Sequence, residues 1–377
     1  MTNTFTILGG GIAGLTTALA LKRIGITATV IEAAPGFRPV GAGIVLAVNA
    51  MRAYRQLSLY DALMAAGNRV DQISIYDEQG RIINRTYTPG VEGLTNLAIH
   101  RAELHRVLLE ALGDAPIVTG KRSKDVEETE RGYRVRFEDG SVADTNYLVV
   151  AEGINSPIRK KIVPGSRIRY SGYTCWRGVA DNNLLNIHES SETWGTKGRF
   201  GMVPIGANKV YWFACKNAPP ADPRMKAMGT ADLLNLFKNY HAPIPAIIRT
   251  TPASQLIWSD ISDLEPMEHY AFGNLVFIGD AAHATTPNMG QGACQAIEDA
   301  MVLANCLKDT PAVPDAFRLF EQRRLERTHY IVKQSWTLGR LAQWENSLAT
   351  RLRNAALRAV PKRVFQRQVE KVYETDF

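Results

Sequence analysis

The sequence has few cysteines and lacks the spacings that hold metals. Its four cysteines form no C-x-x-C pair, and its seven histidines form no H-x-x-x-H or H-E-x-x-H pattern. These absences exclude a locally encoded disulfide framework or zinc site. We therefore predict no metal and a reduced, cytoplasmic protein.

Long apolar runs and low-complexity tracts are also missing. No stretch approaches the roughly 18 apolar residues of a membrane span, and the first apolar run soon meets Gly9, which argues against a signal peptide. Hydrophobic residues make up 45% and charged residues 21% of the 377 residues, an ordinary globular composition. The length favours two domains, or one large α/β domain with an insertion.

An excess of charge of one sign occurs only at the C-terminal end. Residues 318–377 hold 13 lysines and arginines against six acidic residues, whereas residues 1–317 hold 31 of each sign. Apolar residues at helical spacing interleave the basic ones, which is typical of the solvated face of a helix. We therefore predict C-terminal helices and no nucleic-acid partner.

The chain opens with a strand–helix–strand pattern at 4–8, 12–24 and 28–32, which predicts a parallel sheet. A G-x-G-x-x-G motif, residues 9–14, joins the first strand to the helix, and Glu32 closes the second strand. Such glycines permit a tight turn, a pyrophosphate at the helix N-terminus and close helix–strand packing, while the acid binds a ribose. The motif predicts an ADP-containing ligand: NAD, NADP or FAD.

A second motif distinguishes among these ligands. A strand from 274 ends in Gly279-Asp280, and the loop Pro287 to Gly292 then opens a helix over 293–307. The acid can hold a sugar or ribityl hydroxyl, and the helix N-terminus would favour the negative charge of a reduced flavin. FAD is therefore the predicted ligand. We interpret His283 as a loop histidine hydrogen-bonded to the backbone, and Cys294 as a small buried residue.

Strand, helix and turn signals divide the remaining chain. Alternation predicts strands at 72–76 and 82–87 and a hairpin over 133–145, and an aromatic-rich β pattern extends from 170 to about 258. We predict an α/β fold with a Rossmann-like FAD-binding domain, an inserted β-sheet substrate domain and C-terminal helices. The expected boundaries are 1–71, 98–169 and 266–320 for the FAD-binding domain, 72–97 and 170–265 for the substrate domain, and 321–377 for the helices.

Together these motifs resemble the single-component (class A) FAD-dependent aromatic hydroxylases. That family includes para-hydroxybenzoate and salicylate hydroxylases, the tetracycline-inactivating monooxygenase, urate hydroxylase and zeaxanthin epoxidase. The resemblance spans nearly the whole chain. It implies that FAD is held by Gly9, Gly11, Ile12, Ala13, Gly14, Glu32, Ala33, Arg38, Gly43, Arg101, Gly279, Asp280, Pro287, Gly290, Gln291 and Gly292.

One family motif departs from its usual form. The pattern G-A-D-G-x-x-S-x-x-R is replaced here by a segment that begins Val150-Ala151-Glu152-Gly153 and ends at Arg159. Valine stands in place of glycine, and glutamate in place of aspartate. Because the family uses this motif in both FAD and NAD(P)H binding, the departure concerns the handling of the reductant.

The aromatic block resembles the branch that contains urate hydroxylase and zeaxanthin epoxidase. Arg177, Arg199 and Tyr211 occupy positions similar to the substrate-binding residues of urate hydroxylase, and Arg177 departs from the asparagine expected there. With Pro287 and Met289 they form our predicted substrate pocket. Arg199 could equally belong to a structural ion pair, and the aromatic residues could be plain core.

The resemblance implies an NAD(P)H-dependent monooxygenase that uses O₂ to hydroxylate a small aromatic or heteroaromatic substrate through a flavin C4a-hydroperoxide. The flavin carries the chemistry, so no catalytic side chain is assigned. A single dinucleotide motif fits an NADH or NADPH that binds transiently. The alternatives are a related flavin-dependent reductase or epoxidase and a noncatalytic flavoprotein. A halogenase is disfavoured because no W-x-W-x-I-P occurs. The oligomeric state is expected to be monomer or homodimer.

Overall fold

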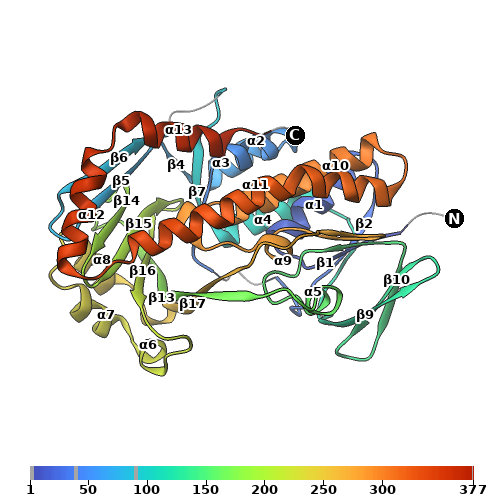
Figure 1. Ribbon diagram of the computed structural model, residues 1–377, viewed down its shortest axis with the longest axis horizontal. Helices are drawn as coiled ribbons and strands as arrows, with labels where there is room; N and C mark the ends of the chain where they lie inside the picture. Colours follow the sequence, from blue (N-terminus) through green and yellow to red (C-terminus); the bar gives the residue numbers. More distant parts are fainter. Residues whose placement is uncertain (1–3, 38–40, 89–91, 376) are drawn as a thin grey trace.

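The computed structural model describes residues 4–37, 41–88, 92–375 and 377, which form an elongated α/β molecule (Figure 1). A six-stranded sheet holds the N-terminal motif. Its strands β1, β2, β8, β12 and β19 are mutually parallel, and β18 is an antiparallel edge strand. Across the sheet the order is β18 (Ala271–Phe272), β19 (Leu275–Phe277), β12 (Tyr147–Val150), β1 (Phe5–Leu8), β2 (Ala28–Ile31) and β8 (Ile117–Val118).

Apolar strands explain why this sheet is central. All four residues of β1 are buried, as are all three of β19, which is expected of parallel strands covered on both faces. The helices α1 (Ile12–Arg23), α4 (Arg101–Leu112) and α10 (Gly292–Asp309) pack together beside it. A separate three-stranded antiparallel sheet contacts the parallel sheet and consists of β9 (Ser123–Thr129), β10 (Gly132–Phe137) and β11 (Val142–Thr145). The short helix α5 (Pro157–Ile162) packs on β9.

A second large sheet occupies the other end of the molecule (Figure 1). Its order is β17 (Ile257–Leu264), β13 (Ile168–Asp181), β16 (Lys209–Asn217), β15 (Gly198–Ile205), β14 (Ser190–Gly195), β5 (Gln72–Asp77) and β6 (Ile82–Tyr87). Successive side chains of a strand point to opposite faces. One face carries Trp176, Phe200 and Trp212 and packs on α7 (Thr230–Phe237) and α8 (Ile244–Thr250). The short α6 (Pro223–Ala227) precedes α7.

Smaller elements join the two ends. The third sheet, β3 (Gly43–Leu46), β7 (Asn96–His100) and β4 (Asn68–Val70), contacts α2 (Val48–Gln56) and α3 (Tyr60–Ala66). Val70 and Ala98 of this sheet pack against Val203 and Ile205 of β15. Short helical turns α9 (Asp280–His283), η1 (Ala253–Gln255) and η2 (Pro287–Met289) complete the connections.

Long helices close the chain. The 30-residue α11 (Val313–Ala342) runs along the molecule from the parallel sheet to the seven-stranded sheet, and α12 (Ser347–Ala359) and α13 (Lys362–Tyr373) follow it (Figure 1). Phe317, Phe320 and Ile331 of α11 enter the same core as β1. Because α11 also contacts η2 and β13, it connects the loop of the second motif to the seven-stranded sheet.

The predicted fold class is confirmed: an α/β nucleotide-binding sheet, a second β-sheet region and C-terminal helices are present. The predicted strands and helices also appear, with bounds shifted by a few residues, as in α1, which ends at Arg23 rather than at 24. The domain boundaries stay a prediction. Within the described residues no helix has both the length and the apolar character needed to cross a membrane.

Candidate active site

The glycine loop after β1 is shaped by contacts that only glycine allows. Gly9 has φ +104°, and a Cβ there would strike the carbonyl oxygen of Ala151. A Cβ on Gly14 would strike the carbonyl oxygen of Gly9, so α1 could not approach the loop. In contrast, a Cβ on Gly11 would meet no atom within 4 Å. The fold therefore requires Gly9 and Gly14, whereas the space at Gly11 is left for something other than this chain.

Glu32 stabilises the same loop. Its Oε2 accepts a hydrogen bond of 2.7 Å from the Gly10 amide, and its Oε1 accepts one of 2.7 Å from the Ala34 amide. A carboxylate oxygen has two lone pairs, so both oxygens can still accept a hydroxyl group. Ala33 lies in the chain between Glu32 and Ala34, inside the turn that the second hydrogen bond closes. Arg38 falls outside the described residues.

The second motif lies directly against the first. Gly279 has φ +56°, and a Cβ there would lie 2.9 Å from the Cβ of Ala13 and 3.2 Å from that of Ala296. The end of β19 is thereby wedged between the N-terminal parts of α1 and α10. The next residue, Asp280, is exposed at this junction. Burial on its protein side raises its pKa, against the opposing influence of His283 and Arg101.

The loop before α10 reaches the same junction. After η2, Gly290 turns the chain with φ +64°, and a Cβ on Gly292 would lie 3.9 Å from Oδ1 of Asp280. Arg101, at the start of α4, is exposed, and its amide donates to Ala42. The Gln291 side chain points the other way, into the interior, where Oε1 accepts from Nδ2 of Asn49 at 2.9 Å. Only its backbone faces the loop.

These positions fit FAD on structural grounds. Free space at Gly11 lies before the N-terminus of α1, where amide groups carry partial positive charge suited to a pyrophosphate. The exposed Asp280 offers a carboxylate to a hydroxyl group, and the N-terminus of α10 opens beside it. Arg101 makes no hydrogen bond through its guanidinium to any described residue, so its charge is available to a ligand.

A buried ion cluster lies beneath the second motif. Asp299 of α10 accepts hydrogen bonds from the Gly279 amide at 2.8 Å, from Nε of Arg324 at 2.7 Å, and contacts Nε2 of His283 at 2.6 Å. His283 therefore bonds to a carboxylate rather than to the backbone, and our prediction of a backbone partner is wrong. All three side chains are at least 97% buried. The imidazole of His283 is therefore engaged by Asp299, the carboxylate that also holds the Gly279 amide.

Glu298 extends this cluster toward the C-terminus. It accepts from Arg324 at 2.7 Å, from both ends of the Arg327 guanidinium at 2.6 and 2.7 Å, and from Asn49 at 2.5 Å. Arg327 also donates to the carbonyl of Val372 in α13. Cys294, which opens α10, is fully buried as predicted, and its Sγ accepts from the Ala47 amide.

The seven-stranded sheet turns a polar face toward this loop. Arg199 is 97% buried, and its guanidinium donates to Gln343 at 2.5 Å, to Glu192 at 3.1 Å and to Asn288 at 2.8 Å. Tyr173 also donates to Oδ1 of Asn288, at 3.1 Å. Arg199 is therefore fully engaged within the protein, which favours the ion-pair alternative over direct ligand binding.

Arg177 is the more available of the two arginines. It is half-buried on the same face and donates to Oγ of Ser259 at 2.8 Å, and Tyr211 is its diagonal neighbour on β16. A Cβ on Gly43 would overlap the ring of Tyr211, so β3 covers that ring closely. The structure brings Arg177, Tyr211 and Gly43 together, whereas Arg199 lies on β15 and bonds to Asn288, the middle residue of η2.

The altered family motif forms a local structural site. Glu152 accepts hydrogen bonds from the hydroxyls of Ser123 and of Ser156, the latter at 2.8 Å. Its pKa is raised by burial, which these hydrogen bonds oppose. Arg159 is buried, and it donates to the carbonyls of Ile154 and Ala281. The longer acid thus holds β9 to the segment before α5.

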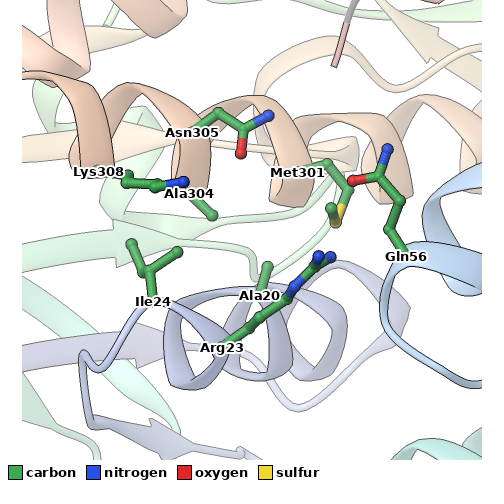
Figure 2. A pocket seen from close by; sticks show the side chains of 8 residues that line it. All are labelled: Ala20, Arg23, Ile24, Gln56, Met301, Ala304, Asn305 and Lys308. Carbon is green, nitrogen blue, oxygen red and sulfur yellow. The ribbon is translucent and has the colours of Figure 1, made fainter.

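A separate hollow lies at the other ends of α1 and α10 (Figure 2). Ala20, Arg23 and Ile24 line it from one side, and Ala304 and Lys308 from another. None of its lining residues belongs to the predicted site, so it is distinct from the ligand-binding ends of these helices.

Sequence reasoning missed three residues that organise the site. Asn288 links the loop to the sheet, Asp299 holds the Gly279 turn, and Gln343 anchors Arg199. Only Asn288 carried a local signal, because it lies inside the P-x-x-G loop. Asp299 and Gln343 are distant in sequence from their partners, and no motif connects them.

Comparison with known proteins agrees with this geometry. A family model described as an FAD binding domain matches residues 1–334. The aurachin C monooxygenase/isomerase of Stigmatella aurantiaca is 40% identical over 94% of both chains. The 2-heptyl-3-hydroxy-4(1H)-quinolone synthase of Pseudomonas aeruginosa is 36% identical over 95% of this chain and 94% of that one.

The structure also resembles a solved enzyme. The Klebsiella pneumoniae protein HpxO, complexed with FAD and uric acid, superposes with a TM-score of 0.87 at 28% identity, covering 98% of this chain and 96% of that one. The FAD-binding motifs, the sheet arrangement and these relatives lead to one conclusion. The chain belongs to the FAD-binding-domain family and is an FAD-dependent monooxygenase of the class A flavin hydroxylases.

Proposed function

We propose that this monooxygenase hydroxylates a planar heteroaromatic substrate of the 4(1H)-quinolone class. The observation that carries the proposal is the half-exposed Arg177, held by Ser259 and neighbouring Tyr211 on the polar sheet face. A guanidinium donates to a ring carbonyl or enolate oxygen, and flanking aromatic rings fit a flat apolar body. The name of the Pseudomonas aeruginosa relative, a 2-heptyl-3-hydroxy-4(1H)-quinolone synthase, supports this substrate class.

The chain's own residues would perform binding and orientation. FAD, reduced by NADH or NADPH, supplies the activation of O₂ and the transfer of one oxygen atom. The loop at Gly11 and the α1 N-terminus would hold the pyrophosphate, and Asp280 a hydroxyl of the sugar or ribityl chain. The α10 N-terminus would favour negative charge on the reduced ring, while Pro287 and Met289 close the loop against it. Arg177 and Tyr211 would orient the substrate and exclude water.

The test compares reductant consumption with product formation. Purified holoenzyme is given NADH or NADPH in air with 2-heptyl-4(1H)-quinolone, urate or a simple phenol. We expect the quinolone alone to accelerate reductant oxidation strongly and to gain one oxygen atom by mass spectrometry. Preference for urate or the phenol would refute the substrate class while leaving the monooxygenase assignment intact.

Arg177→Gln provides the residue-level test. The variant keeps a polar side chain but shortens it and removes the charge, so we expect the quinolone KM to rise about tenfold or more, the loss of one charged hydrogen bond. Arg131→Gln, on the distant β9–β10 turn, is the matched control and should leave KM unchanged. An unchanged KM in Arg177→Gln would remove Arg177 from the pocket.

We further propose a cytoplasmic location and a monomeric or homodimeric state. Four free, buried thiols suit a reducing compartment. Light scattering of the purified holoenzyme would establish the mass in solution, and a tetramer would contradict the proposal.

A further inference from the structure

Two cysteines face each other across the polar face of the seven-stranded sheet. Cys175 of β13 is paired directly with Cys215 of β16 in an antiparallel register. Both are free thiols, both are 1% exposed, and both belong to one buried cluster with Tyr173 and Ile261. The other two cysteines, Cys294 and Cys306, lie on α10 and take no part in this pair.

The register already suits a covalent bond. Residues directly opposite in antiparallel strands have Cα atoms about 4.5 or 5.5 Å apart, depending on the type of pair. Disulfides span Cα separations of roughly 4.4 to 6.8 Å. Either type of pair therefore allows a disulfide between Cys175 and Cys215 without shifting a strand, because residues directly opposite each other in a sheet carry their side chains on the same face.

Positive charge surrounds the pair. Arg177 follows Cys175 by two residues and so lies on its face of β13, and Arg199 is directly opposite Cys215 in β15. Burial acts to raise the pKa of Cys175, but the neighbouring Cys215 thiol and the two guanidinium groups outweigh it and lower that pKa to about 7. Burial raises the pKa of Cys294 to about 12. Cys175 is therefore better poised for nucleophilic attack than Cys294.

The pair also lies where an oxidant would arise. Tyr173, on the same face two residues before Cys175, donates to Asn288 in the loop beside the flavin site. A flavin monooxygenase that consumes reductant and O₂ without hydroxylating a substrate releases hydrogen peroxide. That peroxide would form at the flavin site, beside the loop that Tyr173 contacts.

We propose that Cys175 and Cys215 form a peroxide-sensitive dithiol in the substrate pocket, which closes to a cross-strand disulfide when the enzyme turns over without substrate. The inference rests on the monooxygenase class and not on the quinolone assignment. Closure would draw the sulfur of Cys175 away from Arg177 and so disturb the residue that orients the substrate. The enzyme would thereby slow its own release of peroxide.

The chemistry balances with hydrogen peroxide as the only oxidant. The Cys175 thiolate attacks one peroxide oxygen, the O–O bond breaks, and a sulfenic acid and one water form. The Cys215 sulfur then attacks the sulfenic sulfur, the S–O bond breaks, and a second water leaves as the disulfide forms. Each cysteine gives up one hydrogen atom, and one peroxide becomes two waters.

The holoenzyme is incubated with NAD(P)H in air without substrate, or with added hydrogen peroxide. One portion is then weighed intact by mass spectrometry, and another is alkylated and digested. We expect a cross-linked peptide pair containing positions 175 and 215, a whole-protein mass lower by two hydrogen atoms, and several-fold lower activity that dithiothreitol restores. Catalase should prevent the change when NAD(P)H is the trigger.

Variants separate the pair from other thiols. Cys215→Ser should abolish the cross-link and let Cys175 progress to a sulfinic acid, whereas Cys306→Ser should retain the cross-link. The proposal is overturned if the wild-type peptides that contain positions 175 and 215 are alkylated and unlinked after peroxide treatment. This result does not depend on whether the variants fold. Links only between molecules, or an activity loss that dithiothreitol cannot reverse, would also overturn it.

Discussion

At the scale of single residues, glycine has two distinct uses in the N-terminal loop. Gly14 lacks a Cβ because the carbonyl of Gly9 occupies its place, so it serves helix packing. Gly11 lacks a Cβ although no atom of the described chain lies within 4 Å of that position. Gly14 is needed for the chain to fold, and Gly11 is needed to bind the cofactor, a distinction that the motif alone does not make.

Substitution of these glycines should separate folding from cofactor binding. Gly11→Val should yield folded protein with most of its FAD missing, because the valine fills the space before α1 without striking the chain. Gly14→Val should lower the free energy of unfolding by several kcal/mol, as expected for overpacking against backbone. Flavin absorbance per protein and urea denaturation of the apoproteins would measure both, and a fully yellow Gly11→Val would refute the binding role.

At the scale of elements, the end of β19 and the middle parts of α10 and α11 are tied by buried charge rather than by apolar contact alone. Asp299 and Glu298 meet Arg324 and Arg327 in a region where an unpaired charge would cost several kcal/mol. Every one of these charges has a partner. The cluster therefore fixes the position of the Gly279 turn, and with it Asp280, relative to the helices.

This cluster should make stability depend on pH. Burial alone would raise the pKa of Asp299, but His283 and Arg324 outweigh it and lower the pKa to about 2 from an ordinary 3.8. The stabilisation is present above the unfolded value and is lost as pH falls through the folded one. From pH 5 to pH 3 this group should cost the wild type about 1 kcal/mol of unfolding free energy.

Asp299→Asn removes the titration and provides the comparison. Urea denaturation at pH 5, 4 and 3 should show a shallower loss of stability in the variant, by that same amount. Equal slopes for both proteins would mean that Asp299 titrates normally in the folded state.

Elements were more predictable from the sequence than their contacts were. The glycine motif, Glu32 and Asp280 are local in sequence and repeat a general physical solution to binding a dinucleotide, so their strands and helices could be predicted. The hydrogen-bond partner of His283 could not be predicted. Asp299 lies on the following helix α10, and the sequence does not indicate which α10 side chains face His283. The same holds for Gln343 beside Arg199.

At the scale of the whole molecule, a single side chain connects the flavin loop to the seven-stranded sheet and to α11. Oδ1 of Asn288 accepts from Arg199 and Tyr173, while its Nδ2 donates to Thr286 at 2.8 Å and to the carbonyl of Ser335 at 2.9 Å. All of its hydrogen-bonding capacity toward these partners is in use. Asn288 therefore fixes the flavin loop relative to the seven-stranded sheet and to α11.

Gly339 of α11 makes room for this connection, and its substitution tests it. A Cβ there would overlap Nδ2 of Asn288 and lie 3.1 Å from its Cγ. Gly339→Ala should displace Asn288 and loosen the substrate face, so hydroxylated product per NAD(P)H consumed should fall several-fold, while FAD content stays at the wild-type level. Alanine favours a helix over glycine by about 1 kcal/mol, which offsets the local strain, so stability should change little. Thr337→Ala, exposed two residues earlier, is the matched control and should couple normally. A tightly coupled Gly339→Ala would mean that the two sheets are held in register without Asn288.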